Sequence, residues 1–476
     1  METLQRTANR GSLATEYDID NSCKFEPDNS ESLTKAAATG GDRRKATLSL
    51  WCKRTELTGS QASILFLTGV NGNKYTTLAW GTNDEINFHY YNSGSYPYSF
   101  LTNRRFRDTT AWYHIVVAID TTQGTAANRV KFYVNGVQET SFSTEVYPSQ
   151  NIDTPFNNDS ATYPMEIGND SIFDMGGDPL AGYLADYYLI DGSQLAPTEF
   201  GEFDEDSGIW IPKAYTGSFG SNGFYLDFAD AADLGDDESG NGNDFTEQNI
   251  SAADQATDTP TNNFAVLNTI SATSTDLHAT EGATFLSNND GSISWLTISA
   301  TIGVTSGKWY WETQKNNNTG NFFSGIAASD DPALRTANLL GATSEGSSIA
   351  FQYNNNSIAN GSGSFTMVSG QIMMFALDMD NGALYFGKNG VWQNSSDPTS
   401  GASKTGASTL WSSFDDKIVL PAFQAFQNNQ IFTNFGGYSS YAISSAASDA
   451  NGYGTFEYAP PTGYYALCTK NLAEFG

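Results

Sequence analysis

Two Asn-Gly dipeptides, each placed between strand-like segments, constrain the fold of this chain most strongly. They lie in the strings VKFYVNGVQ (130–138) and GALYFGKNGVW (382–392). Asn-Gly accepts positive φ at both central positions of a tight turn, so each string predicts a two-residue β-hairpin. In the first string Val130, Phe132 and Val134 share one face, the period-two pattern of a half-buried strand. One such hairpin in each half predicts two β-sandwich modules in series.

Length and composition agree with this prediction. The chain has 476 residues, more than one hydrophobic core usually serves. Aromatic residues make up 13%, and 45 glycines accompany frequent Asn and Ser turn signals, a mixture typical of short strands. The sequence contains no heptad repeat, so we expect no coiled coil. We therefore expect an all-β fold with two antiparallel, jelly-roll-like β-sandwich domains in tandem.

The charge balance argues against several classes of partner. The chain carries 53 acidic and 23 basic residues, for a formal net charge of −30. Because a polyanion would be repelled, we expect no nucleic-acid binding. No apolar run approaches the length of a transmembrane helix, so we expect no membrane insertion. The three cysteines, Cys23, Cys52 and Cys468, are too few and too scattered for a disulfide framework.

Composition shifts along the chain indicate its domain organisation. Between Ala214 and Gly307 there is no Lys or Arg, while Asp and Glu accumulate. Aromatic residues within 199–228 and 456–476 indicate that these segments pack onto a module and are not free linkers. We expect four parts: a polar N-terminal docking arm (1–20), a first sandwich (21–230), an acidic linker (231–262), and a second sandwich with a C-terminal extension (263–476).

Ordered strings in each half carry a resemblance to known families. The first half contains LSLWCKR (48–54), WYHIVVAID (112–120), VKFYVNGVQ (130–138) and GYLADYYLID (182–191). In this order they resemble the laminin G-like, or concanavalin A-like, sandwich family. The second half contains SGKWYWE (306–312), GIAASDD (325–331), FALDMDNGALYFGKNGVW (375–392), LPAF (420–423) and TNFG (433–436). This set resembles a SPRY domain.

The pairing of the two modules resembles structural proteins of marine tailed bacteriophages. That resemblance implies a non-enzymatic virion protein, such as a tail fibre, head fibre, knob or capsid decoration, assembled in the host cytoplasm. Its partners would be other virion proteins and copies of itself, most often as a trimer, and it would contact the host surface. A fold alone does not settle function. A glycan-binding surface adhesin and a polysaccharide hydrolase stay open as alternatives.

Catalytic motifs are sparse in the sequence. There are three histidines, His89, His114 and His278, and His114 lies within an apolar strand pattern, where a structural role is expected. No nucleophile elbow, HExxH helix or phosphate-binding glycine loop is present. Glu202, Asp204 and Asp206 alternate as the carboxylates of concanavalin A-like glycosidases do. Turn residues bracket this run, which favours a solvated turn, and we expect the protein not to be an enzyme.

A tyrosine-rich string is the best candidate ligand site of the first half. HYYNSGSYPYSF (89–100) combines Tyr, Ser, Gly and Asn, a composition that makes adaptable binding surfaces. Tyr91, Tyr96 and Tyr98 could stack on a sugar. The alternative is that these rings alternate into the core or contact another virion subunit.

Arginines form the densest basic cluster of this acidic chain. Arg104 and Arg105, with Arg107 beside them, could clamp an acidic glycan or pair with a neighbouring copy. Internal salt bridges are the plainer alternative. In the second half, the SPRY resemblance places candidate partner-binding residues by position at Asp330, Asp331, Tyr353 and Asn354.

The string DDESGNGND (236–244) is the one candidate metal site. It groups Asp236, Asp237 and Asp244 with amide side chains and glycines, which suits a hard cation such as calcium. An EF-hand is excluded because position twelve counted from Asp237 is Gln248 instead of Glu. The alternative is a solvated acidic loop, and no other cofactor is expected.

Overall fold

The computed structural model describes all residues except 1–16, 37–40, 58–61, 158–162, 174–176, 178, 289–294, 317–320, 337, 342–346, 411 and 427–428. These residues form two compact units, the first ending at Thr261 and the second comprising Asn262–Gly476. Strands dominate both units, which confirms the all-β prediction, and the α-helix of the described part is α2 (Thr469–Phe475). Short 3-10 helices connect strands: η1 (Pro27–Asn29), η2 (Ala126–Asn128), η3 (Pro197–Glu199), η4 (Ala252–Asp254), η5 (Thr269–Ser271), η6 (Pro332–Leu334), η7 (Pro398–Ser403) and η8 (Ser412–Phe414).

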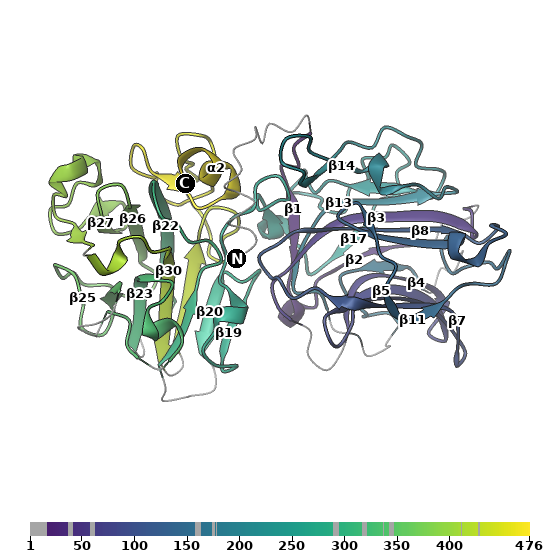
Figure 1. Cartoon of the computed structure of the whole chain (residues 1–476), viewed down its shortest axis with the longest axis horizontal. Helices are drawn as coiled ribbons and strands as arrows, with labels where there is room; N and C mark the ends of the chain where they lie inside the picture. The colour runs from purple at the N-terminus through teal and green to yellow at the C-terminus, as the bar shows by residue number, and fades with distance from the viewer. Residues whose placement is uncertain are drawn as a thin grey trace. The chain divides into compact units, whose positions relative to one another are not determined.

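Two facing sheets build the first unit (Figure 1). In the described residues, sheet A has the order β10-β9-β8-β3-β13-β1-β18, with β16 paired to β13, and sheet B has the order β11-β7-β6-β5-β4-β12-β2-β17. The strands of sheet A are β1 (Ser22–Phe25), β3 (Lys45–Arg54), β8 (Tyr113–Asp120), β9 (Val130–Val134), β10 (Val137–Gln138), β13 (Gly182–Asp191), β16 (Phe224–Leu226) and β18 (Gln255–Ala256). Those of sheet B are β2 (Ser32–Lys35), β4 (Ser63–Asn71), β5 (Lys74–Trp80), β6 (Glu85–Asn92), β7 (Ser95–Arg105), β11 (Phe142–Val146), β12 (Met165–Ile167) and β17 (Thr246–Gln248).

Side-chain alternation along the strands fills the space between these sheets. Leu48, Leu50 and Cys52 of β3 lie in one core cluster with Phe88 of β6. Full burial of a Leu or Phe side chain contributes roughly 1.5–3 kcal/mol, so the two inner faces account for most of the stability. Successive residues of a strand point to opposite faces, which places Lys53 on the outer face of sheet A.

The second unit also consists of two sheets in the described residues. Sheet C has the order β19-β20-β31-β22-β26-β27-β28, with β29 on β27 and β32 on β22, and sheet D has the order β21-β30-β23-β24-β25. Trp311 of β22 stacks on Phe375 of β26 at 5.1 Å, and both share a core with Phe423 of β30. The strands of sheet C are β19 (Leu277–Thr280), β20 (Phe285–Asn288), β22 (Lys308–Lys315), β26 (Ile372–Asp378), β27 (Ala383–Lys388), β28 (Val391–Trp392), β29 (Ser408–Thr409), β31 (Gln430–Asn434) and β32 (Tyr465–Ala466). Those of sheet D are β21 (Leu296–Ser299), β23 (Asn321–Ala328), β24 (Ser348–Gln352), β25 (Ser357–Ala359) and β30 (Val419–Phe426).

Both predicted Asn-Gly hairpins form. Asn135 and Gly136 have φ values of 48° and 76°, and they join β9 to β10. Asn389 and Gly390 have φ values of 46° and 79°, and they join β27 to β28. Positive φ at both central residues is the requirement of a type I′ turn. The local turn chemistry is therefore confirmed in each unit.

Alanine at Gly136 should destabilise its unit more than alanine at Gly390 destabilises the other. Each change places a β-carbon on a left-handed backbone, at about 1–2 kcal/mol. The new β-carbon at Gly136 would also lie 2.2 Å from the Trp210 ring, against 3.0 Å from Tyr458 at Gly390. Because Trp210 is packed on His114, we expect a further cost of about 1–3 kcal/mol at Gly136. Thermal unfolding of both variants measures the difference, and equal shifts would contradict it.

Of residues 231–262, which we expected to form an acidic linker, 231–261 are instead part of the first unit. β17 pairs with β2 in sheet B, and β18 pairs with β1 in sheet A. Leu234 and Phe245 lie in the core of the sandwich. The domain boundary therefore falls between Thr261 and Asn262, and the acidic segment completes both sheets.

The start of the described chain also belongs to this unit. Ile19 is buried, its N–H donates to Thr261 Oγ1 at 3.2 Å, and that hydroxyl donates back to the Ile19 carbonyl at 2.8 Å. Residues 17–20, assigned from the sequence to a docking arm, therefore pack on the sandwich. Residues 1–16 of that arm lie outside the described residues.

Two irregular segments pack against outer sheet faces, as predicted. In the first unit, β14 (Gly201–Phe203) and β15 (Trp210–Pro212) form a short ribbon. Around it, aromatic residues cover Tyr188 of β13, with Phe200 at 5.4 Å and Phe219 at 6.4 Å between ring centroids. In the second unit, Phe456 packs edge-on against Tyr310 of β22 at 5.0 Å. These segments supply the polar groups that several buried side chains need.

Candidate functional site

The β6–β7 hairpin brings two of the three predicted tyrosines together at the surface. The Tyr91 and Tyr96 ring centroids are 5.4 Å apart, and Tyr96 is 51% exposed. Two further residues extend the group: Tyr75 lies 5.2 Å from Tyr91, and His89 lies 5.2 Å from Tyr96. We call Tyr75, His89, Tyr91 and Tyr96 the tyrosine surface.

Strand register explains how these rings meet. Tyr75 of β5 is the cross-strand partner of Tyr91 in β6. Phe88 and Tyr90 lie in the core, so alternation turns His89 and Tyr91 to the outer face of sheet B. The β6–β7 register shifts after Tyr90, and such bulges re-aim the side chains beside them. The tyrosine surface is thus assembled from three neighbouring strands.

Tyr98, the third predicted tyrosine, lies in the core instead. It is fully buried, its hydroxyl lies 2.6 Å from Thr76 Oγ1, and its ring stacks on Phe88 at 5.2 Å. Burial raises the pKa of its phenol well above the usual range. The prediction that Tyr98 contacts a ligand is therefore wrong.

Two members of the tyrosine surface, His89 and Tyr75, stay neutral over a wide pH range. Burial lowers the pKa of the His89 imidazole to about 4 and raises the pKa of the Tyr75 phenol to about 12. His89 Nδ1 lies 3.2 Å from Asn87 Oδ1. Neutral rings with polar edges suit an uncharged, hydroxyl-rich ligand better than an ion.

Two of the three arginines of the cluster form ion pairs within the first unit. Arg104 Nη1 lies 3.0 Å from Glu139 Oε1, and Arg107 Nε lies 2.8 Å from Asp84 Oδ2. Arg105 is exposed. Arg104 lies eight residue steps along β7 from Tyr96, about 27 Å at the usual rise of a strand. The arginines are therefore not part of the tyrosine surface, and two of them form the internal salt bridges left open as the alternative.

The four candidates of the second unit do not form one site. Asp330 and Asp331 follow β23, whereas Tyr353 and Asn354 follow β24, and these antiparallel strands place the two pairs at opposite ends. Asp330 forms an ion pair with Lys417, and Asp331 is the buried N-cap of η6. Tyr353 is buried in the core, which contradicts its predicted role, and Asn354 is exposed.

In the predicted calcium loop, the carboxylates of Asp237 and Asp244 accept hydrogen bonds from N–H and hydroxyl groups of the protein. Asp237 is buried, and its Oδ1 accepts from two backbone N–H groups at 2.9 Å. Its Oδ2 accepts from a third backbone N–H and from the Ser239 hydroxyl, both at 2.8 Å. Asp244 accepts from the Asp237 N–H at 3.2 Å, and Asp236 is half-buried. Within the described ranges no three His, Cys, Asp or Glu side chains are grouped to hold a metal. These contacts are those of an ordered acidic turn.

The alternating carboxylates Glu202, Asp204 and Asp206 do not line one strand. β14 ends at Phe203, and Asp204 accepts from the Ser207 N–H at 2.6 Å in the turn toward β15. Glu202 is exposed and lies 3.8 Å from the Lys213 ammonium. The run is a turn, as its flanking residues suggest.

In a buried Ser–His hydrogen bond of the first unit, the histidine donates to the serine, which is the wrong direction for nucleophilic catalysis. His114 Nε2 lies 2.9 Å from Ser49 Oγ, and the Trp210 indole N–H donates to His114 Nδ1 at 3.0 Å. Because Nδ1 accepts, the proton of the neutral ring sits on Nε2 and is donated to the serine. A catalytic base would have to accept the serine proton instead. Both side chains are buried, and the pair is structural.

His114 should make the first unit less stable in acid. Burial lowers the pKa of its imidazole to about 3, whereas an unfolded histidine titrates near 6.5. Between these values the unfolded chain binds the additional proton, so the free energy of unfolding falls as the pH falls. From pH 7 to 5 the wild type should lose about 2 kcal/mol more than His114→Gln. Denaturant unfolding at both pH values measures this, with exposed His278→Gln as control. An unchanged pH dependence in His114→Gln would contradict the assignment.

Asp186 forms a buried cluster that the sequence gives no reason to single out. It lies at a register shift of β13 with φ 43°, and its carboxylate accepts from the Tyr225 hydroxyl at 2.8 Å and from the Tyr17 hydroxyl at 3.1 Å. Burial raises the pKa of this carboxyl to about 7. The cluster anchors Tyr17 to sheet A.

Comparison with known proteins agrees with the architecture of the first unit. Residues 28–197 match the family model described as the Concanavalin A-like lectin/glucanases superfamily. No curated protein sequence matches the chain. Among the helices of the described residues, none has the length and apolarity needed to cross a bilayer.

Several solved structures are similar to parts of the chain. The SPRY domain of human HERC1 is 17% identical, with a TM-score of 0.26, over 35% of this chain and 96% of that domain. Domain 4 of AbnA, a GH43 extracellular arabinanase from Geobacillus stearothermophilus in complex with arabinotriose, is 18% identical, with a TM-score of 0.25, over 33% of this chain and 65% of that one. The heptameric SAP-like pentraxin from Limulus polyphemus is 18% identical, with a TM-score of 0.26, over 38% and 80%.

Proposed function

We propose that this chain is a non-enzymatic recognition protein whose first unit binds a glycan through the tyrosine surface. The observation that carries the proposal is the placement of Tyr91 and Tyr96, with Tyr75 and His89, on the outer face of sheet B. Aromatic rings offer an apolar face to the C–H groups of a sugar, while hydroxyl and imidazole edges hydrogen-bond its hydroxyls. The match of residues 28–197 to a lectin and glucanase superfamily supports a carbohydrate ligand.

The setting that we propose is the surface of a bacteriophage particle. The tandem of a laminin G-like and a SPRY-like module supports this setting, in which the protein oligomerises as a trimer and residues 1–16 attach it to the particle. Glycan binding by the first unit would then give the particle a contact with the host surface. Because a net charge of −30 repels anionic surfaces, contact with such a surface would depend on short-range contacts of this kind.

Tyr96→Ala should abolish most glycan binding. Truncation of an exposed aromatic anchor at the centre of a binding surface costs about 2 kcal/mol or more, which is about 30-fold in affinity. A glycan array with the full-length protein identifies the ligand, and titration of Tyr96→Ala and Tyr96→Phe against that ligand measures the loss. Tyr96→Phe keeps the ring and should retain most of the affinity.

Phe203→Ala is the matched control, because Phe203 is 50% exposed and lies on the β14–β15 ribbon. It should bind the glycan as the wild type does. Full affinity in Tyr96→Ala would overturn the site, and no saturable binding to any glycan would overturn the ligand class.

Deletion of residues 1–16 tests the virion setting separately. The truncated protein keeps Tyr17–Asp20 on the sandwich, so both units should fold and glycan binding should persist. Its incorporation into particles should be lost, as measured by mass spectrometry of purified virions, and light scattering of the intact protein should give the mass of a trimer. Normal incorporation of the truncated chain would refute the attachment role.

A further inference from the structure

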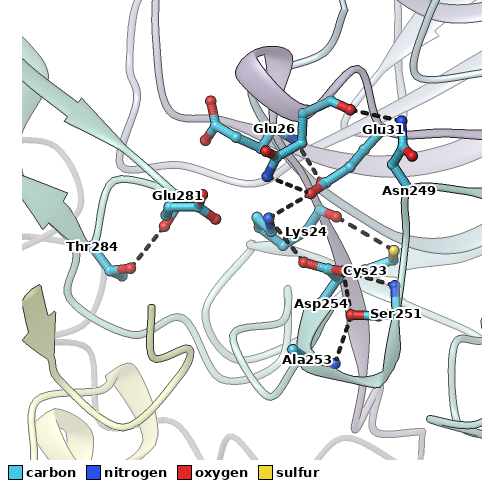
Figure 2. Close-up of polar contacts among 11 residues, drawn as sticks. Cys23, Lys24, Glu26, Glu31, Asn249, Ser251, Ala253, Asp254, Glu281 and Thr284 are labelled. Atoms are coloured by element: carbon cyan, nitrogen blue, oxygen red, sulfur yellow. Dashed lines mark hydrogen bonds and ion pairs between the residues drawn. The ribbon is translucent and has the colours of Figure 1, made fainter. Parts of the chain in front are cut away.

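A buried lysine on the outer face of sheet A lies between two buried carboxyl groups. Lys24 Nζ is 3.0 Å from Glu31 Oε1 and 2.9 Å from Asp254 Oδ1 (Figure 2). The side chains are 1%, 2% and 8% exposed respectively. β1 supplies the lysine, and the segment before β2 supplies Glu31. Asp254 comes from η4, near the C-terminal end of the same unit in the sequence. The three groups thus meet only in the folded sandwich.

The second oxygen of Asp254 faces a pair of donors. The Ser251 N–H donates to Asp254 Oδ2 at 2.8 Å, and the Ser251 hydroxyl donates to the same oxygen at 3.1 Å. Oδ1 is left facing Lys24. Two donors at this distance stabilise the negative oxygen that develops when a nucleophile adds to a carboxyl carbon. The surroundings of Asp254 therefore favour attack by the lysine nitrogen.

Glu31 is placed to move protons between the lysine and the departing oxygen. Its Oε1 contacts Lys24 Nζ, and its Oε2 accepts from the Glu26 N–H at 2.8 Å, which fixes the carboxyl group. Burial raises the pKa of Glu31, while the neighbouring Lys24 opposes this shift. A carboxyl group with a raised pKa takes up and returns a proton more easily near neutral pH.

We propose that Lys24 and Asp254 condense into an intramolecular amide. After Nζ gives a proton to Glu31, it adds to the Asp254 carboxyl carbon and forms the C–N bond. The bond from that carbon to Oδ1 breaks, and Oδ1 leaves as water with the two protons that Nζ has lost. One ammonium and one carboxylate become one neutral amide and one water, so no oxidant, reductant or cofactor takes part. Oδ2 becomes the amide carbonyl and keeps the Ser251 N–H as its donor.

The fold favours this condensation, which is unfavourable between free groups in water, in two ways. Reacting groups held in contact behave as if at effective concentrations up to about 10⁵–10⁸ M. Formation of a neutral amide also removes two charges from a site where charges are poorly solvated. The product would link the two ends of the first unit's sequence covalently, because Lys24 lies near its N-terminal end and Asp254 near its C-terminal end.

A second buried lysine offers a matched control on the same sheet face. Lys53 Nζ lies 2.6 Å from Asp258 Oδ2, and both side chains are at most 1% exposed. The other oxygen of Asp258 accepts from the Trp112 indole N–H at 3.1 Å. An indole donates but cannot carry a proton between two groups as Glu31 can. We expect Lys53 and Asp258 to persist as an ion pair.

Intact-mass spectrometry of the full-length protein tests the amide directly. The wild type should weigh less than its sequence by one water, and a tryptic digest should contain one branched peptide that joins Lys24 to Asp254. Lys24→Arg should restore the full mass, Lys53→Arg should keep the deficit, and Glu31→Gln should slow its appearance after refolding.

The wild-type measurement decides the question even if a variant fails to fold. A full sequence mass after prolonged incubation of the folded wild type would overturn the proposal. A water loss that the digest locates at an Asp-Gly succinimide, without the branched peptide, would overturn it equally.

Discussion

Lys53→Met should destabilise the first unit by about 3–5 kcal/mol, a large part of the stability of a typical domain. Lys53 and Asp258 form a buried ion pair at 2.6 Å, with side chains that are 0% and 1% exposed. Without the ammonium, the Asp258 carboxylate would stay buried and lose its cation. Hydrogen exchange of β3 and β13 measures the effect, and the second unit serves as an internal reference.

The double variant Lys53→Met with Asp258→Leu should recover part of this loss, because the Trp112 indole N–H still loses its acceptor, at about 1–3 kcal/mol. Replacement of both members of a buried ion pair by apolar residues is often neutral, because no uncompensated charge remains. If Lys53→Met lowered the free energy of unfolding by less than about 1 kcal/mol, the ion pair would contribute no more than a surface pair does. That result would contradict the prediction.

Glu312→Leu should release the segment that contains residues 457 and 458 from the rest of the second unit. Glu312 of β22 is fully buried, and its carboxylate accepts from the hydroxyls of Tyr310 and Tyr441 at 2.8 and 2.7 Å. It also accepts from the N–H groups of Glu457 and Tyr458 at 3.0 and 2.8 Å. Each buried donor left without an acceptor costs about 1–3 kcal/mol, so the two buried tyrosine hydroxyls alone should cost at least about 2 kcal/mol. The N–H groups of Glu457 and Tyr458 are part-buried and lose the acceptor that holds their segment.

Hydrogen exchange at residues 457 and 458, together with limited proteolysis after residue 436, measures this release. Exposed Glu474→Leu in α2 is the control and should leave both readouts unchanged. If the 457 and 458 amides stayed as protected in Glu312→Leu as in the wild type, the carboxylate would not be what holds the segment.

The sequence predicted the fold well wherever the signal is local. The turns at Asn135-Gly136 and Asn389-Gly390 depend on two adjacent residues, and both formed. The acidic segment was misassigned because its carboxylates acquire partners only across the whole unit: Asp254 meets Lys24, and Asp258 meets Lys53. A local excess of acidic residues looks the same whether it is solvated or buried against distant lysines.

The candidate site could be predicted only in part, for a related reason. Tyr91 and Tyr96 were found from composition, but Tyr98 was assigned to the surface because a bulge after Tyr90 changes which face each residue takes. Tyr75 joins the tyrosine surface by pairing with Tyr91 on a neighbouring strand, and a cross-strand register is not visible in one sequence.

The chain enters and leaves the first unit at neighbouring points. Ile19 is hydrogen-bonded to Thr261, and Ser22 pairs with Ala256. If a pulling force were applied between the N-terminus and the second unit, it would pass through these few contacts and bypass the rest of the sandwich. The first unit would thus be shielded from tension until β1 separates from β18, and a covalent bond from Lys24 to Asp254 would raise that mechanical limit to the strength of the backbone itself.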